Sequence, residues 1–188
     1  MMETRLALLD AAQEMAQKVG YNAFSFNDLA RRLGIKPASV HYHFPTKGDL
    51  GRAMMARYRL SFLGRLHEIE TGTKRARARL KRFVGLFQSA LATDRLCLCG
   101  TLATEYATLP AAVKREVRRF FDDSEAWLAR VLEEGRRAGQ LSFDGTAPGA
   151  ARTLFAAFEG AMISARTFGE PARLEEAGRW LVAGVSPR

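Results

Sequence analysis

Cys97 and Cys99 are the two cysteines of this 188-residue sequence. A cysteine thiolate is a nucleophile and a metal ligand, so these are the side chains with the most intrinsic reactivity. On a helix, residues two positions apart point to different sides, and we therefore expect no disulfide between them. Further metal-ligating residues are missing nearby in the sequence, so no metal site is predicted. Two interpretations stay open, which are a reactive thiol and plain buried core residues.

The remaining polar residues form no recognisable catalytic pattern. The sequence has no phosphate-binding glycine loop and no nucleophile–base constellation. Of the three histidines, His41 and His43 diverge on a helix, and His67 lies in another expected element, so they do not predict a metal site. We therefore predict a protein that is not an enzyme and that uses neither a metal nor a cofactor.

The charge balance favours a partner with dense negative charge. The formal net charge is +9, and residues 1–60 carry nine Lys and Arg against five Asp and Glu. A second basic run, residues 74–82, contains no acidic residue and would wrap several faces of a helix. No apolar run reaches the roughly 18 residues that span a bilayer, and the N-terminus lacks a signal-peptide pattern. We expect a cytoplasmic protein without a membrane partner.

Apolar residues recur at three- and four-residue spacing along almost the whole chain. This pattern predicts an all-α protein of about nine helices, since strand-like alternation bounded by turn residues is missing. The first helix ends at Gly20, where glycine suits a helix stop. Beyond residue 46 we expect helices at about 47–70, 74–93, 98–107, 111–138, 149–168 and 171–183.

The segment from Ser25 to Pro45 carries the punctuation of two short helices. Ser25 and Asp28 have the spacing of a capping box, with Asp in place of the usual Glu or Gln. Gly34 ends this helix, and Pro37 suits the first turn of the next one. The second helix ends before Pro45, because the residue that precedes a proline is disfavoured in helical geometry.

Two short helices joined at a glycine predict a helix-turn-helix. Val40 and Phe44, four residues apart, form the inward face of the second helix. The other side chains of this helix can enter a major groove and meet base edges and phosphates. These expected DNA contacts are Lys36, Ala38, Ser39, His41 and Tyr42. The sequence thus predicts a DNA-binding head at residues 1–50 and a helical body at residues 51–188.

The stretch from Phe26 to Leu50, FNDLARRLGIKPASVHYHFPTKGDL, resembles the signature of the TetR family of bacterial repressors. The resemblance implies a three-helix head joined by a fourth helix to an effector-binding and dimerisation body. It also implies that His41 or Tyr42 contacts DNA. The start of the fourth helix favours an anion, because its backbone N–H groups point outward there. The resemblance implies that Lys47 contacts a phosphate from this position, and Ser25 and Asn27, at the start of the second helix, are also expected to meet phosphate.

The helical body is expected to mediate dimerisation and sensing. A short recognition helix reads few bases, so we expect a homodimer on a palindromic operator of double-stranded DNA. In the TetR family the last two helices pair with their copies, and the interface residues expected here are Phe155, Phe158, Met162 and Trp180. A small-molecule effector should lie among the middle helices. The candidates, each alternatively a plain core residue, are Phe83, Phe87, Tyr106 and Trp127, with Leu91 and Phe120.

The segment from Cys97 to Glu105, CLCGTLATE, resembles a branch of the TetR family that senses electrophiles and oxidants. The resemblance makes Cys97 the candidate sensor, with Cys99 beside it. A partner lysine of that branch falls at Arg166, so the resemblance does not support lysine-dependent chemistry. We predict a repressor released by an effector or by cysteine modification. The alternatives are an architectural DNA-binding protein without an effector and a helical enzyme.

Overall fold

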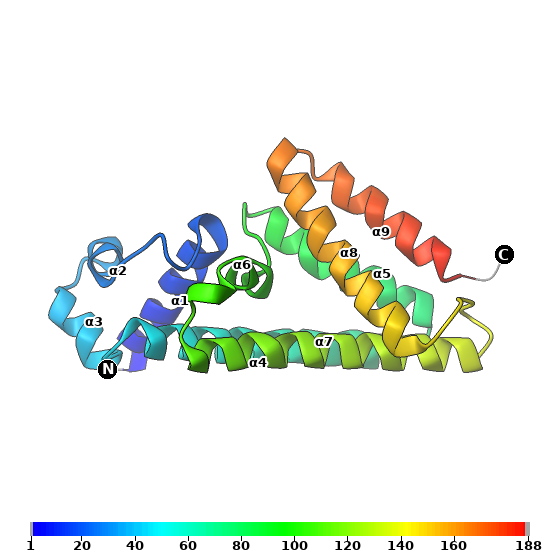
Figure 1. Cartoon of the computed structure of the whole chain (residues 1–188), viewed down its shortest axis with the longest axis horizontal. Helices are drawn as coiled ribbons and strands as arrows, with labels where there is room; N and C mark the ends of the chain where they lie inside the picture. Colours follow the sequence, from blue (N-terminus) through cyan, green and yellow to red (C-terminus); the bar gives the residue numbers. More distant parts are fainter. Residues whose placement is uncertain (1, 187–188) are drawn as a thin grey trace. The chain divides into compact units, whose positions relative to one another are not determined.

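The structure is a computed structural model that describes residues 2–186. Within this range the chain forms nine α-helices and one short 3-10 helix and has no strand, which confirms the predicted all-α class (Figure 1). No helix in this range is long and apolar enough to cross a membrane. The elements are α1 (Met2–Val19), α2 (Phe26–Leu33), α3 (Pro37–His43), α4 (Lys47–Gly72), α5 (Ala76–Leu91), α6 (Leu98–Thr104), η1 (Tyr106–Thr108), α7 (Ala111–Arg137), α8 (Ala147–Phe168) and α9 (Ala172–Gly184).

Local capping fixes the helices of the head where the sequence predicts them. The Asp28 N–H donates to Ser25 Oγ at 3.3 Å, and the Ser25 N–H donates to Asp28 Oδ2 at 2.8 Å, which completes the capping box of α2. Gly34 then ends α2 in the left-handed region, with φ of 65°. The same reciprocal pair recurs before α4, because the Asp49 N–H donates to Thr46 Oγ1 at 3.1 Å and the Thr46 N–H donates to Asp49 Oδ2 at 3.2 Å.

The chain packs as two compact units. The first contains the residues up to Ser61 together with Cys97–Phe120, and the second contains Phe62–Leu96 together with the residues from Phe121 onward. The first unit therefore groups the helix-turn-helix with the start of α4, α6, η1 and the start of α7. The boundary that we expect at residue 50 marks the end of the helix-turn-helix motif in the sequence. It divides the chain differently from the two packing units.

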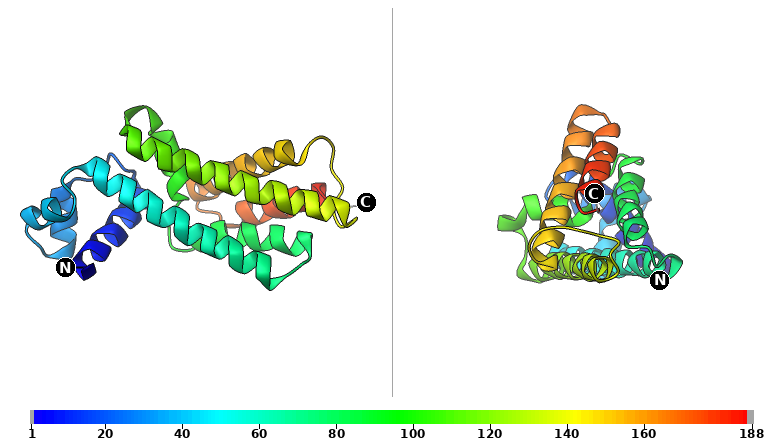
Figure 2. Two further views of the ribbon diagram at one scale, coloured as in Figure 1. Left: turned by 90° about the horizontal axis from the view of Figure 1, so that it is seen from below. Right: turned by 90° about the vertical axis from the view of Figure 1, so that its right-hand side faces the viewer.

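The second unit is built on an aromatic core. Helices α8 and α9 lie side by side, and α5 packs against both (Figure 2). Phe83 of α5 is fully buried at the centre. Its ring centroid lies between 5.4 and 6.3 Å from those of five other rings, which are Phe62, Phe87, Trp127, Phe155 and Phe158. Helix α9 approaches α5 closely at Gly178, where a Cβ atom would lie 2.7 Å from Val84 Cγ1.

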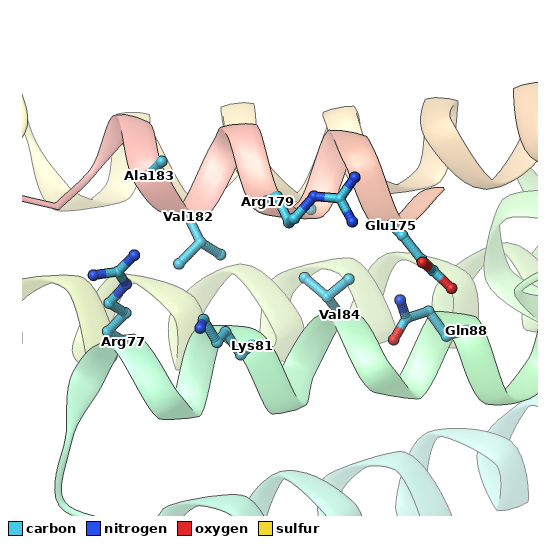
Figure 3. A pocket seen from close by; sticks show the side chains of 9 residues that line it. Arg77, Lys81, Val84, Gln88, Glu175, Arg179, Val182 and Ala183 are labelled. Atoms are coloured by element: carbon cyan, nitrogen blue, oxygen red, sulfur yellow. The ribbon is translucent and has the colours of Figure 1, made fainter. Parts of the chain in front are cut away.

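The basic run at residues 74–82 does wrap several faces of α5, as predicted. Arg79 is buried, and its Nη1 lies 2.8 Å from Glu134 Oε2 in an ion pair. Arg77 and Lys81 are exposed and line a groove of about 480 Å³ between α5 and α9, together with Arg179 (Figure 3). Within this run, Arg79 therefore forms a structural ion pair, whereas Arg77 and Lys81 line a solvated surface groove.

Candidate functional site

The recognition helix α3 divides its side chains between core and solvent as the sequence predicts. Val40 is fully buried and Phe44 is 2% exposed, so this face packs inside the first unit. On the other side, Tyr42 is 70% exposed. The expected DNA contacts Lys36, Ala38 and His41 are also exposed, and Ser39 is half-buried. The start of α3 and its outer face thus present Lys36, Ala38, His41 and Tyr42 to solvent.

His41 and Ser25, two of the expected DNA contacts, are held in place by neighbouring groups. The His41 ring lies edge-on to Phe26, with ring centroids 4.8 Å apart. Asn27 is exposed at the start of α2, whereas the Ser25 hydroxyl already donates to Asp28 Oδ2 at 2.7 Å. The bonds from Ser25 lower the pKa of the Asp28 carboxyl. Ser25 therefore has a capping role in this structure, and its phosphate contact stays a prediction.

The Lys47 ammonium group is turned inward. Its Nζ donates to the Phe24 carbonyl oxygen and lies 4.7 Å and 4.6 Å from the ring centroids of Tyr21 and Phe24, within cation–π distance. Burial lowers the pKa of the Lys47 ammonium, while the Glu105 and Asp28 charges oppose that effect. The bond to Phe24 uses one of the three donors of the Lys47 ammonium group, and its phosphate contact stays a prediction.

A polar contact that the sequence did not predict joins the α1–α2 connection to the α6–η1 region of the same unit. The Asn22 N–H donates to Glu105 Oε2 at 3.1 Å, and Asn22 Nδ2 donates to Thr108 Oγ1 at 2.8 Å. Gly20 makes room for this contact, because a Cβ atom there would lie 2.6 Å from Glu105 Oε1. The partners are more than 80 positions apart, so no periodic pattern marks them.

Tyr21 makes the stability of the head sensitive to alkaline pH. Its Oη donates to the Lys47 carbonyl at 2.7 Å, and burial, followed by the Glu105 charge, raises its pKa to about 12 from an ordinary value of 10.0. The unfolded chain ionises this hydroxyl first, so the stabilisation is complete below pH 10 and is lost as the pH rises toward 12. We expect a loss of about 2 kcal/mol in the free energy of unfolding between pH 9 and 11.5.

Urea titrations of the wild type and Tyr21→Phe at both pH values measure this loss. The Tyr21→Phe variant starts less stable by about 1 kcal/mol, because it lacks the hydrogen bond to the Lys47 carbonyl. Its further decline between the two pH values should be smaller than that of the wild type. Equal declines in the two proteins would show that Tyr21 does not titrate in this way.

Comparison with known protein families shows to which family this chain belongs. Residues 8–54 match the family model described as bacterial regulatory proteins, tetR family. Residues 72–181 match the model described as the tetracyclin repressor-like C-terminal domain. The chain belongs to the TetR family. It is therefore a transcriptional regulator with a helix-turn-helix DNA-binding domain, as its α3 surface indicates.

Individual relatives agree over nearly the whole chain. A TetR-family transcriptional regulator from Agrobacterium tumefaciens superimposes with a TM-score of 0.96 at 32% sequence identity, covering 99% of each chain. The HTH-type transcriptional repressor NemR of Escherichia coli K12 is 25% identical over 171 residues, which are 87% of this chain and 84% of NemR. The transcriptional regulator AcuR of Cereibacter sphaeroides is 24% identical over 164 residues, which are 85% of this chain and 75% of AcuR.

The two cysteines of this TetR-family regulator lie together, which corrects the expectation that they point apart. Their Sγ atoms are 3.2 Å apart, and both residues are buried. The reason is that Cys97 is not inside a helix. It is the N-cap of α6 with ψ of 129°, so its side chain does not follow the helical rotation that separates residues two apart. The Tyr58 hydroxyl lies 3.6 Å from Cys97 Sγ as a donor.

The structure brings three of the expected effector contacts together. Phe83, Phe87 and Trp127 share the core of the second unit, and the Phe83 and Trp127 rings are stacked with centroids 5.6 Å apart. Tyr106 belongs instead to the first unit, where Lys114 lies over its ring at 5.2 Å. Of the two further candidates, Leu91 is half-buried in α5, and Phe120 stacks on Tyr58 at 5.4 Å.

Three of the four expected interface residues are core residues of the single chain. Phe155, Phe158 and Met162 are at most 1% exposed, so they offer no surface to a second copy. The sequence could not separate them from a contact face, because α8 is apolar on both sides. Trp180 of α9, by contrast, is 80% exposed. Ile163 and Phe168 are the other large apolar side chains exposed on these two helices.

Proposed function

We propose that this regulator is a homodimeric repressor that binds a palindromic operator and leaves it when an effector binds or a cysteine is modified. The observation that carries the proposal is the recognition helix α3, which buries Val40 and Phe44 and exposes Tyr42 and its polar neighbours. A helix of this length reads few base pairs, so a two-fold dimer on two half-sites supplies the specificity that one head lacks.

The exposed face of α8 and α9 supports dimerisation. Ala156, Gly160 and Ile163 are exposed at four- and three-residue spacing and so share one side of α8. Small residues let a second helix approach closely, and Trp180 adds a large apolar side chain on α9. A contiguous exposed apolar surface is typical of an interface, and an isologous pairing of this face would form a closed dimer.

Substitution of Trp180 by glutamate should shift the chain toward monomer, because it replaces the large exposed apolar side chain of α9 with a charge. Sedimentation equilibrium should show the dimer dissociation constant rising by at least about tenfold, which corresponds to about 1.4 kcal/mol. Leu60→Glu is the matched control, since Leu60 is also an exposed apolar residue but lies on α4. An unchanged dissociation constant for Trp180→Glu, or an equal change for Leu60→Glu, would remove α9 from the proposed interface.

An effector site is supported by polar groups left unsatisfied in the second unit. Trp127 Nε1 and Ser124 Oγ are buried without a hydrogen-bond partner, and they lie three residues apart on the same side of α7. An unsatisfied buried polar group costs about 1 to 3 kcal/mol. A ligand that accepts from these donors beside the Phe83 ring would remove this cost, so we propose a small planar effector with a hydrogen-bond acceptor.

The first unit supplies a path from α6 to the DNA-binding head. Cys97 immediately precedes α6, and the Glu105 carboxylate that follows α6 holds the Asn22 N–H at the α1–α2 connection. A displacement of α6 would therefore disturb the hydrogen bond that joins Glu105 to the α1–α2 connection of the head. An effector or modification acts on this equilibrium only through its differential affinity for the two arrangements.

The function is tested by release from DNA. The wild-type chain is bound to a fluorescent duplex that carries the palindrome upstream of its own gene, and candidate planar acceptor compounds are added. We expect at least one compound to weaken binding about tenfold, and Trp127→Phe, which keeps the ring but lacks the donor, to respond less. Binding that every compound leaves unchanged would favour an architectural DNA-binding protein.

A further inference from the structure

The sulfur pair at Cys97 and Cys99 has a geometry suited to reversible oxidation. Their Sγ atoms are 3.2 Å apart, and a disulfide requires about 2.05 Å, so closure needs a movement of only about 1 Å. Because Cys97 lies outside α6, rotation of its side chain does not disturb a helical turn. Both sulfurs belong to the first unit, which also contains the DNA-binding head.

We propose that Cys97 and Cys99 are a dithiol that a hydroperoxide converts to an intrachain disulfide, with Cys99 as the resolving thiol. This inference rests on the proposed function and specifies its regulation at the same site. It assigns a specific role to Cys99.

The reaction balances in two steps. First, the Cys97 thiol loses its proton and the thiolate attacks one oxygen of the hydroperoxide, so that an S–O bond forms, the O–O bond breaks and the leaving hydroxide or alkoxide takes up that proton to become water or an alcohol. Second, the Cys99 sulfur attacks the sulfenic acid of Cys97, so that an S–S bond forms, the S–O bond breaks and water leaves with the Cys99 proton. The two thiols lose two electrons and two protons, and the hydroperoxide is reduced to water and an alcohol, or to two waters.

The contact with Tyr58 distinguishes Cys97 from Cys99 as the attacking sulfur, and the burial of both sulfurs favours a small oxidant. The Tyr58 hydroxyl donates toward Cys97 Sγ at 3.6 Å and can stabilise negative charge on that sulfur. Cys97 is 2% exposed and Cys99 is fully buried, so both sulfurs are shielded from bulky thiol reagents. Hydrogen peroxide is small enough to be the test oxidant.

Closure of the disulfide would move groups that position the head. Drawing Cys97 Sγ toward Cys99 changes its contact with the Tyr58 hydroxyl on α4, the helix that begins at Lys47. Cys99 lies in the first turn of α6, which packs against α1. Oxidation is therefore coupled to two helices that support the DNA-binding surface.

Thiol counting tests the chemistry without reference to DNA. The reduced chain is treated with hydrogen peroxide, denatured, alkylated with N-ethylmaleimide and weighed by intact mass spectrometry. We expect loss of both alkylation sites, monomer mobility on a non-reducing gel and recovery of both sites with dithiothreitol. Two alkylation sites after oxidation, loss only through cross-linked chains, or loss that dithiothreitol does not restore would each overturn the proposal.

Two variants test the role of Cys99. Cys99→Ala keeps the site apolar and Cys99→Ser keeps its volume, so at least one should fold as the wild type does by circular dichroism. In that variant, oxidised Cys97 should be trapped by dimedone as a sulfenic acid, whereas the wild type should show little trapping. Equal trapping in both proteins would overturn the resolving role.

A measurement of operator binding distinguishes the regulatory role of the disulfide from the proposed function of the chain as a repressor. The disulfide form, verified by mass, should bind the upstream duplex at least tenfold more weakly than the reduced form, with recovery by dithiothreitol. Equal affinities would overturn the regulatory role of the disulfide while the reduced chain still binds. Failure of the reduced chain to bind the duplex would instead contradict the proposed function and leave the thiol counts intact.

Discussion

Substitution of Phe83 by alanine should lower the free energy of unfolding by about 3 to 5 kcal/mol, the range measured for large buried aromatic residues. Phe83 is fully buried, and five rings surround it, among them Trp127 in a stacked arrangement 5.6 Å away. Removing the ring leaves a cavity that this rigid aromatic shell cannot close. The loss of contacts therefore adds to the lost transfer free energy.

Urea denaturation followed by tryptophan fluorescence measures the effect of Phe83→Ala. Phe168→Ala is the matched control, because Phe168 is 59% exposed and the Arg173 guanidinium lies 3.8 Å from its ring centroid. The control should change the free energy of unfolding by less than about 1 kcal/mol. Equal losses in the two variants would mean that Phe83 is not the centre of the second unit's core.

The double substitution Lys36→Ala and Tyr42→Ala should weaken DNA binding about 100-fold, or about 2.7 kcal/mol, without changing the fold. Both side chains are exposed, and Lys36 makes no capping hydrogen bond at the start of α3. A lysine at this place can meet a phosphate, and a tyrosine hydroxyl can donate a charge-assisted hydrogen bond to phosphate or a bond to a base edge. Tyr42 is 70% exposed, so its removal leaves no buried cavity.

Lys74→Ala is the matched control for charge. It removes one positive charge from an exposed residue between α4 and α5, far in sequence from the recognition helix. Fluorescence anisotropy at several salt concentrations should show that the double variant binds more weakly and that its salt dependence is lower by about one counterion. An effect of Lys74→Ala equal to that of the double variant would indicate binding through net charge alone rather than through α3.

Features set by neighbouring residues were predictable from the sequence. The capping box of Ser25 and Asp28, the left-handed Gly34 and the start of α3 at Pro37 are determined within one helical turn, and the structure has all three. The inward positions of Val40 and Phe44 follow equally from helical periodicity. The recognition surface consists of the other side chains of α3 and was predictable for the same reason.

Features that depend on contacts between distant segments were not predictable. The bond from Asn22 to Glu105 joins segments that no local pattern relates. The proximity of the cysteine sulfurs depends on the non-helical backbone of Cys97, and helical geometry alone gave the opposite expectation. On α8, apolar residues occupy both sides of the helix, so periodicity could not tell buried Phe158 from exposed Ile163. Their separation depends on the packing of α5 and α9.

Specific binding of operator DNA is the measurement that tests the central claim most directly. The wild-type chain is titrated into two fluorescent duplexes, one with the palindromic operator that we propose upstream of its own gene and one with the same bases scrambled, at a fixed salt concentration near 0.15 M. We predict that one dimer binds the palindrome at least about 1,000-fold more tightly than the scrambled duplex, the lower end for specific DNA-binding proteins. Equal affinity for the two duplexes would contradict sequence-specific regulation by the α3 surface.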